Sequence, residues 1–268
     1  MTTPAPGVAR AYRWWEAALV GSLLGLSVLA WLLTGWLSMP DMRHGLLTGD
    51  SSMTSMSSTG AATMPMVGLF LVTWVVMMVA MMFPAVSPVV VTFDRWVRRT
   101  HRTRGATIVF LAGYLLVWTV SGLVVYSALV HLGPLLPSGE SALRWGGGLL
   151  VLAGGYQLTP LKQMCLRHCR SPLAFVAQHA VQLRRGSLGA GQVGVVHGIY
   201  CLGCCWALML ILLLLGMMNL AWMAAVAAVI FVEKVLPRGP LVARIVALLL
   251  IAVGAALLVS PLGVPQRG

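Results

Sequence analysis

Apolar residues gather along the chain in seven long runs, which short polar segments with Gly and Pro separate. A helix that crosses a bilayer needs about 20 mostly apolar residues. Runs close to this length cover residues 15–37, 66–91, 106–132, 144–161, 192–217, 220–236 and 241–259. The first run is too long for a signal peptide and has no small-residue cleavage site, so we expect a retained helix. The pattern predicts an all-α polytopic membrane protein, a single domain over residues 1–268 with seven transmembrane helices.

Composition points the same way. The chain is 59% hydrophobic and only 9% charged, and its mean hydropathy is +0.90. A soluble domain is closer to half apolar and a quarter charged. These values exclude an ordinary soluble enzyme, and the apolar content is too high for intrinsic disorder.

The net charge of +12 is best explained by membrane topology. On a soluble chain such an excess would indicate a nucleic-acid partner. If the seven runs alternate across a bilayer, however, all the Lys and Arg residues fall on one side except Arg43, Arg144 and Arg267. The positive-inside rule then places the N-terminus in the cytoplasm and the C-terminus outside. We therefore expect a lipid bilayer, and no nucleic acid, as partner.

Two segments between the runs have a distinct character. Residues 38–65 form a Met/Ser-rich outer stretch without apolar periodicity, which we expect to be a mobile loop. Residues 162–190 form a cytoplasmic segment in which Ser171 and Pro172 signal the start of a helix. We expect this helix to be amphipathic and to lay its apolar side on the inner membrane surface.

The fifth run contains the densest candidate chemistry. His197, Cys201 and either Cys204 or Cys205 are spaced by three or four residues, so they share one face of a helix. Three thiols within five residues suit a soft-metal site or a redox centre. The alternative is that the cysteines act as small apolar packing residues.

A second sulfur group lies in the second run. Its members are methionines at helical spacing: Met77, Met78, Met81 and Met82. At 1.5 Å per residue they lie at about the same depth as the three cysteines, so the two groups can face each other near the middle of the bilayer. Filling of apolar gaps is the alternative role. Pro84 also removes the hydrogen-bond donor for the carbonyl of Ala80, which then needs another partner.

Further sulfur ligands lie on either side of the predicted membrane. The outer loop holds Met39, Met42, Met53 and Met56, and this loop locally resembles the Met motifs of eukaryotic high-affinity copper uptake proteins. On the inner side, Cys165, His168 and Cys169 form a candidate secondary or transfer site. Neighbouring basic residues are expected to lower the pKa values of these two thiols. Reduced thiols without a metal are the alternative.

Predictions also follow from a carboxylate, an asparagine and a pair of glycines. Glu233 lies near the inner end of the sixth run, where it is either a proton site or the partner of Lys234 or a nearby arginine in an ion pair. Asn219 is expected to cap the link between the fifth and sixth runs. Gly194 and Gly198 allow close packing of the fifth helix on a neighbour.

Several of these motifs together resemble a known family. They are Met77-Met78-Val-Ala-Met81-Met82-Phe-Pro84, Cys201-Leu-Gly-Cys204-Cys205-Trp206-Ala-Leu-Met209, the stretch from Gly216 to Met223, and Val232-Glu233-Lys234. The resemblance is to the predicted metal-binding integral membrane protein family, a bacterial family of unknown function. It implies a multi-pass protein of the bacterial inner membrane with a metal site and no assigned reaction.

Thiolates and thioethers together select soft ions, above all Cu(I), with zinc as the second choice. We therefore expect a Cu(I)-handling membrane protein that acts in uptake, transfer or sensing, with a metallochaperone or metalloenzyme as partner. No catalytic residue is assigned, and an enzyme is not the leading interpretation. Two alternatives stay open: a membrane thiol oxidoreductase that uses the cysteines of the fifth run, and a proton-coupled transporter of another substrate that uses Glu233.

Overall fold

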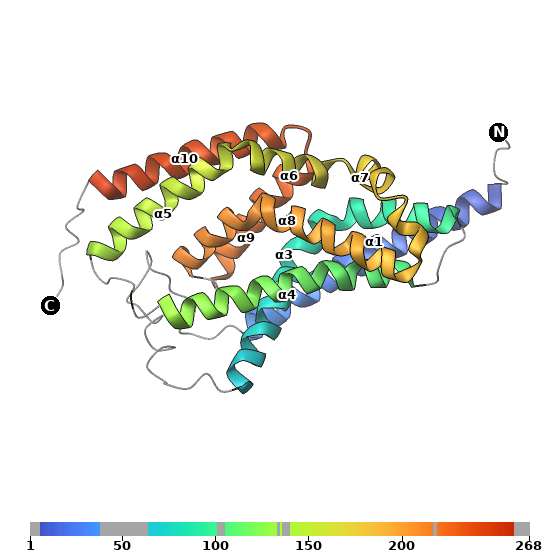
Figure 1. The fold of residues 1–268 in the computed structure, drawn as a ribbon, viewed down its shortest axis with the longest axis horizontal. Helices are drawn as coiled ribbons and strands as arrows, with labels where there is room; N and C mark the ends of the chain where they lie inside the picture. The colour runs from blue at the N-terminus through green and yellow to red at the C-terminus, as the bar shows by residue number, and fades with distance from the viewer. Residues whose placement is uncertain are drawn as a thin grey trace.

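The structure is a computed structural model that describes residues 6–37, 64–100, 105–132, 135, 140–216 and 219–259. This part of the chain is helical and contains no strand, so the all-α prediction is confirmed (Figure 1). The elements are α1 (Pro6–Leu37), α3 (Met64–Arg99), α4 (Ala106–Leu132), α5 (Glu140–Leu158), α6 (Pro160–Arg170), α7 (Pro172–Gln178), the 3-10 helix η3 (Gln182–Arg185), α8 (Ser187–Leu215), α9 (Leu220–Val235) and α10 (Gly239–Val259).

Five of these helices are long and apolar enough to cross a membrane: α1, α3, α4, α8 and α10. The fourth and sixth predicted spans form α5 and α9, which do not meet the same criterion. The fourth also ends earlier than the apolar run suggests. Thr159 caps a new helix there, with Pro160 at its first turn, so the chain bends out of α5 and into α6.

Helix α8 runs through the middle of the fold and lies directly against α4. The two helices run in the same direction (Figure 1). Their contact depends on glycine, because a Cβ at Gly194 would collide with the carbonyl of Phe110 and one at Gly198 would lie 2.9 Å from the side chain of Val117. The predicted close packing at Gly194 and Gly198 is confirmed. It fixes the rotation of α8 and thus the direction in which the cysteines point.

Helix α1 packs antiparallel on α3 and supplies the missing partners of the carbonyl that Pro84 leaves free. Ser27 Oγ donates to the carbonyl of Ala80 at 2.7 Å, and Trp31 Nε1 donates to it at 3.1 Å. A prolyl interruption in the middle of an apolar helix is therefore compensated by protein side chains.

The segment that follows α6 differs from its expected position. Ser171 and Pro172 do begin a helix, α7, as predicted. Two of its apolar side chains, Phe175 and Val176, are 1% and 2% exposed and pack inside the protein, although Leu173 is open. The prediction that the apolar side lies on the membrane surface is wrong for these two residues, because α7 packs on α3 and both side chains are buried.

The turn before α9 has the predicted cap. The side chain of Asn219 accepts hydrogen bonds from the backbone N–H groups of Ala221 and Trp222. The side chain of Leu220 reaches to within 3.5 Å of where a Cβ on Gly35 would lie, so α9 begins beside the end of α1. From there α9 runs back into the fold and carries Glu233 and Lys234 to its centre.

Candidate metal centre

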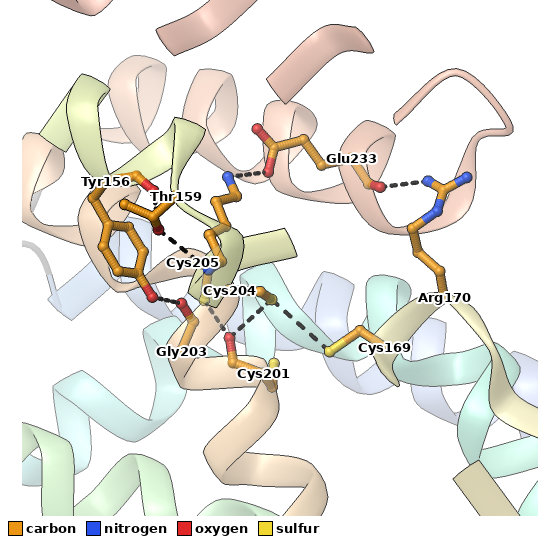
Figure 2. A network of polar contacts seen from close by, with 10 residues as sticks. Tyr156, Thr159, Cys169, Arg170, Cys201, Gly203, Cys204, Cys205 and Glu233 are labelled. Atoms are coloured by element: carbon orange, nitrogen blue, oxygen red, sulfur yellow. Dashed lines mark hydrogen bonds and ion pairs between the residues drawn. The ribbon is translucent and has the colours of Figure 1, made fainter. Parts of the chain in front are cut away.

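The five cysteines of the chain are all buried, all free of disulfide bonds, and drawn together from two helices. Cys165 and Cys169 come from α6, and Cys201, Cys204 and Cys205 come from α8. The Sγ atoms of Cys169 and Cys204 are 3.8 Å apart, and Figure 2 shows these two side chains pointing at each other. We call the five residues the cysteine cluster.

This arrangement corrects the expectation of two separate sulfur sites at different depths. The α6 pair does not form an inner transfer site of its own, because α6 packs along α8 and turns both cysteines toward it. The approach of the helices requires Gly203, where a Cβ would lie 2.8 Å from the Sγ of Cys165. The carbonyl of Gly203 also accepts a 2.5 Å hydrogen bond from the hydroxyl of Tyr156, which ties α5 to the same turn of α8.

Within α8 the thiols are oriented by the helix backbone. Cys204 and Cys205 both donate to the carbonyl of Cys201, at 3.1 Å and 2.9 Å. In the described ranges no three His, Cys, Asp or Glu side chains are grouped so that they could hold a metal ion. The feature that stands out is instead a pair. Metal–thiolate bonds of roughly 2.3 Å place two sulfurs on a shared ion about 4 Å apart, and the Cys169–Cys204 distance of 3.8 Å is close to this.

A buried lysine is in contact with the cysteine cluster. Lys234 of α9 is 6% exposed, and its Nζ lies 2.9 Å from the Sγ of Cys201 and 3.7 Å from the Sδ of Met82. On the other side of Cys201, the hydroxyl of Tyr114 is 3.1 Å from the same Sγ. Cys201 is thus held between a cation and a phenol, both of which stabilise a thiolate over a thiol.

The methionines of α3 are buried, but only one of them has a polar contact with this centre. Met77, Met78, Met81 and Met82 are each at most 1% exposed. Helix α3 packs on α1, α4, α7 and α9, and the described residues show no extensive direct interface between α3 and α8. Lys234 lies between Met82 and Cys201. The predicted direct facing of the two sulfur groups is not seen in the described residues; Met82 and Cys201 are linked only through their contacts with this lysine.

The two candidate histidines have different surroundings. His197 is 1% exposed and lies among the rings of Phe110, Tyr114 and Phe175, with no hydrogen-bond partner for its Nδ1 in the described part of the chain. It lies one turn before Cys201, on the same face of α8. His168 stacks on Tyr200, with ring centroids 4.1 Å apart, and its Nδ1 bonds to a backbone carbonyl of its own helix.

Glu233 forms a buried ion pair, as one of the two interpretations predicted. Its partner is Lys162, and not Lys234 or an arginine. Its Oε2 is 2.7 Å from the Nζ of Lys162, which is 1% exposed. Arg170 binds the backbone carbonyl of Glu233 at 2.6 Å and not the carboxylate (Figure 2). Lys234, the neighbour in sequence, points to the cysteine cluster instead. Of these two consecutive residues of α9, Glu233 is therefore paired with α6, and Lys234 contacts the cysteine cluster.

The thiols of α6 are less acidic than their basic neighbours suggest. Hydrogen bonding with Cys201 and Cys204, together with burial, raises the pKa of Cys169 well above its ordinary value. Burial raises the pKa of Cys165. The expected lowering by nearby Lys and Arg is wrong, because Lys162 is engaged by Glu233 and Arg170 by backbone carbonyls.

Sequence reasoning did not predict the contacts of Lys162, Lys234 and Tyr114. Lys234 was considered only as a partner of Glu233 and Lys162 only as one of the basic residues, although a charged residue inside or beside an apolar run is a functional candidate by default. Tyr114 gave no signal within its run. Of the outer methionines, Met39, Met42, Met53 and Met56 lie outside the described residues.

Comparison with known proteins places the chain in a family. A family model, PpoB2, described as a copper chaperone, matches residues 71–257, which is more than half of the chain. The matched part contains the cysteine cluster, the α3 methionines and Lys234, and it begins after the outer methionine loop. No curated protein and no solved structure matches the chain. The chain belongs to the PpoB2 copper chaperone family, which supports the expected association with copper.

Proposed function

We propose that this protein binds Cu(I) inside the membrane through the cysteine cluster, with Cys169 and Cys204 as its first two ligands. The observation that carries the proposal is the 3.8 Å approach of these two buried thiols from different helices. Membership in a copper chaperone family supports the choice of ion. Copper is the cargo of the site in this proposal, taken up and passed on.

The chemistry of the ligands favours Cu(I) over zinc. Cu(I) is a soft ion that thiolates and thioethers bind well. Structural zinc sites are usually tetrahedral, with four protein ligands. The described residues instead offer one close pair of sulfur atoms. Cys201 and Met82 lie on either side of Lys234, which allows a bound ion to be handed from the first pair to a neighbouring sulfur.

A role at the bacterial inner membrane fits the rest of the chain. Five apolar helices are long enough to cross a bilayer, and the family resemblance of the motifs implies the inner membrane. We propose that the methionine loop at residues 38–65 collects the ion outside and that a metallochaperone or metalloenzyme receives it. Thioethers suit an oxidising exterior because they do not form disulfides.

The burial of the thiols counts against a thiol oxidoreductase. Exchange with a partner disulfide needs access to a thiolate. Cys169 is 7% exposed, and Cys201, Cys204 and Cys205 are 2% exposed or less. A bare ion can enter such a site by ligand exchange, whereas a protein disulfide cannot.

The direct test is the Cu(I) content and affinity of the purified protein. In Cys169→Ser/Cys204→Ser we expect the affinity, measured by competition with a chromogenic Cu(I) chelator, to fall at least about tenfold, because each lost thiolate removes one soft ligand. Met66→Leu/Met223→Leu is the control, since it also removes two sulfur atoms. At 1.5 Å per residue, Met66 lies about 24 Å along α3 from Met82, and Met223 lies about 16 Å along α9 from Lys234.

Unchanged affinity in the double-serine variant, with the methionine control also unchanged, would refute the assignment of the pair. Equal losses in both variants would mean that total sulfur content matters and not this site. A folded protein is confirmed in each case by its helical circular dichroism and melting temperature.

A further inference from the structure

Next to the copper centre, on a different side of α6, lies a basic cavity of about 260 Å³. It is enclosed by the end of α5, by α6 and by the start of α10. Its lining contains four cationic side chains, Lys162, Arg167, Arg170 and Arg244, and no Asp or Glu. The proposed copper ligands Cys169 and Cys204 do not line this cavity.

The positive charge of the cavity is only partly compensated. Lys162 is paired with Glu233, and Arg170 bonds to two backbone carbonyls. Arg167 and Arg244 make neither a hydrogen bond nor an ion pair with any residue that the structure describes. Two guanidinium groups beside one cavity favour an anion, and guanidinium groups match phosphate especially well.

A buried amide in the wall adds a second, independent observation. Gln157 is 2% exposed, and both its Nε2 and its Oε1 are buried without a hydrogen-bond partner in the described part of the chain. Burying an amide without partners is costly. A ligand with an acceptor oxygen and a hydroxyl would satisfy both atoms at once.

The outer surface of the same helices is apolar. Leu161 and Met164 of α6 are 54% and 47% exposed, and Leu241 and Ile245 of α10 are 54% and 49% exposed. These residues lie next to cavity residues along both helices. A polar cavity that is bordered by apolar side chains fits an amphipathic ligand, with its head group inside and its chains along the helices.

We propose that this cavity binds the phosphate head group of an anionic phospholipid. The phosphate oxygens accept hydrogen bonds from Arg167, Arg244 and the Nε2 of Gln157, and a head-group hydroxyl donates to its Oε1. One water molecule takes about 30 Å³, so 260 Å³ has room for a phosphate with a small polyol. The bound lipid holds α6 against α5 and α10, beside the copper centre.

The test uses the full-length protein in detergent, to which phosphatidylglycerol, phosphatidylcholine or inorganic phosphate is added. We expect phosphatidylglycerol to stay bound in native mass spectra and to raise the melting temperature, and phosphatidylcholine to do neither. In Arg167→Gln/Arg244→Gln we expect phosphatidylglycerol affinity to fall at least about tenfold, since each basic group near a lipid surface contributes measurably to binding.

Arg184→Gln/Arg185→Gln is the matched control, because it removes two exposed arginines from η3, outside the cavity. It should retain phosphatidylglycerol like the wild type. Equal retention by the Arg167/Arg244 variant, or equal binding of phosphatidylcholine, would overturn the proposal. If inorganic phosphate alone gave the full thermal shift, the lipid assignment would be wrong. Without added lipid, the Cu(I) affinity of the Arg167/Arg244 variant should equal that of the wild type.

Discussion

Lys234 is a buried lysine whose ammonium group lies next to two sulfur atoms. It bonds to the Sγ of Cys201 and contacts the Sδ of Met82, and its partner in sequence, Glu233, is engaged elsewhere. A buried ammonium needs a nearby negative charge. Among the described residues, the acidic group that contacts its Nζ is the thiol of Cys201, so a thiolate there and the ammonium would stabilise each other's charged forms.

Replacing this lysine tests that dependence. In Lys234→Met, which has a similar shape and no charge, we expect Cu(I) affinity to fall at least about tenfold, because a copper–thiolate group with excess negative charge loses its buried counter-charge. The melting temperature of the copper-free protein should stay the same or rise, since the thiols can then remain neutral. Competition titration with a Cu(I) chelator and thermal unfolding measure the two effects.

Lys234→Arg is the control for charge, and it should keep most of the affinity. Copper binding that is equally tight in Lys234→Met and in the wild type would show that the ammonium does not support the bound ion. A fall in both affinity and melting temperature would instead indicate a purely structural role for Lys234.

Helix α1 acts on the site through α3, at the level of whole elements. It lies far in sequence from Met82, yet Ser27 and Trp31 bind the Ala80 carbonyl that Pro84 cannot bond. Met81 and Met82 directly follow Ala80 in the same turn of α3. Docking of α1 thus holds the part of α3 that faces Lys234.

We expect Ser27→Ala to lower the free energy of unfolding by about 0.5–1.5 kcal/mol, because it removes one of two donors from a buried carbonyl. Trp31 retains one bond to that oxygen, so the loss should be partial. Ser22→Ala on the same helix is the control, since Ser22 is exposed and bonds to its own backbone at Leu19. Denaturation in a mixed detergent series measures both, and equal stability of the two variants would contradict the assignment.

Apolar runs and local caps predicted the helices well, because both are properties of neighbouring residues. Asn219 caps α9 and the Gly194–Gly198 pair brings α8 against α4, as their spacing indicated. The meeting of Cys169 with Cys204 was not predictable in this way. It depends on the bend at Thr159 and Pro160, a cap signal that is present in the sequence but lies inside an apolar run. Which way Lys234 points depends on the rotation of α9, which only its packing sets.

For the whole molecule, the directions of the helices bear on how often the chain crosses the membrane. Because α4 and α8 run in the same direction, the chain returns between them, and α5 is the long helix described in that interval. Helix α5 lies antiparallel to α10, with Gly147 beside Gly254 and Gly154 beside Ala247. Although α5 and α9 fall short of the length-and-apolarity criterion, this geometry favours seven crossings.

Fusions of alkaline phosphatase, which is active only outside the inner membrane, distinguish seven crossings from five. With seven, we expect a fusion after Leu132 to be active and fusions after Arg99 and Arg185 to be inactive, in line with the positive-inside rule. With five, α5 would not cross and the fusion after Arg185 would be active. Immunoblots that show equal expression of the fusions are the control.

The contact between Lys234 and Cys201 also bears on selectivity between ions. With Cys201 as a neutral thiol, a monovalent ion held by the thiolates of Cys169 and Cys204 beside this ammonium forms an electrically neutral group. A divalent ion in the same place leaves one positive charge in a medium of low dielectric constant, where such a charge is far more costly than in water. If the proposed site holds the ion, we therefore expect Lys234 to favour a monovalent over a divalent ion by its charge alone, although it is not itself a ligand.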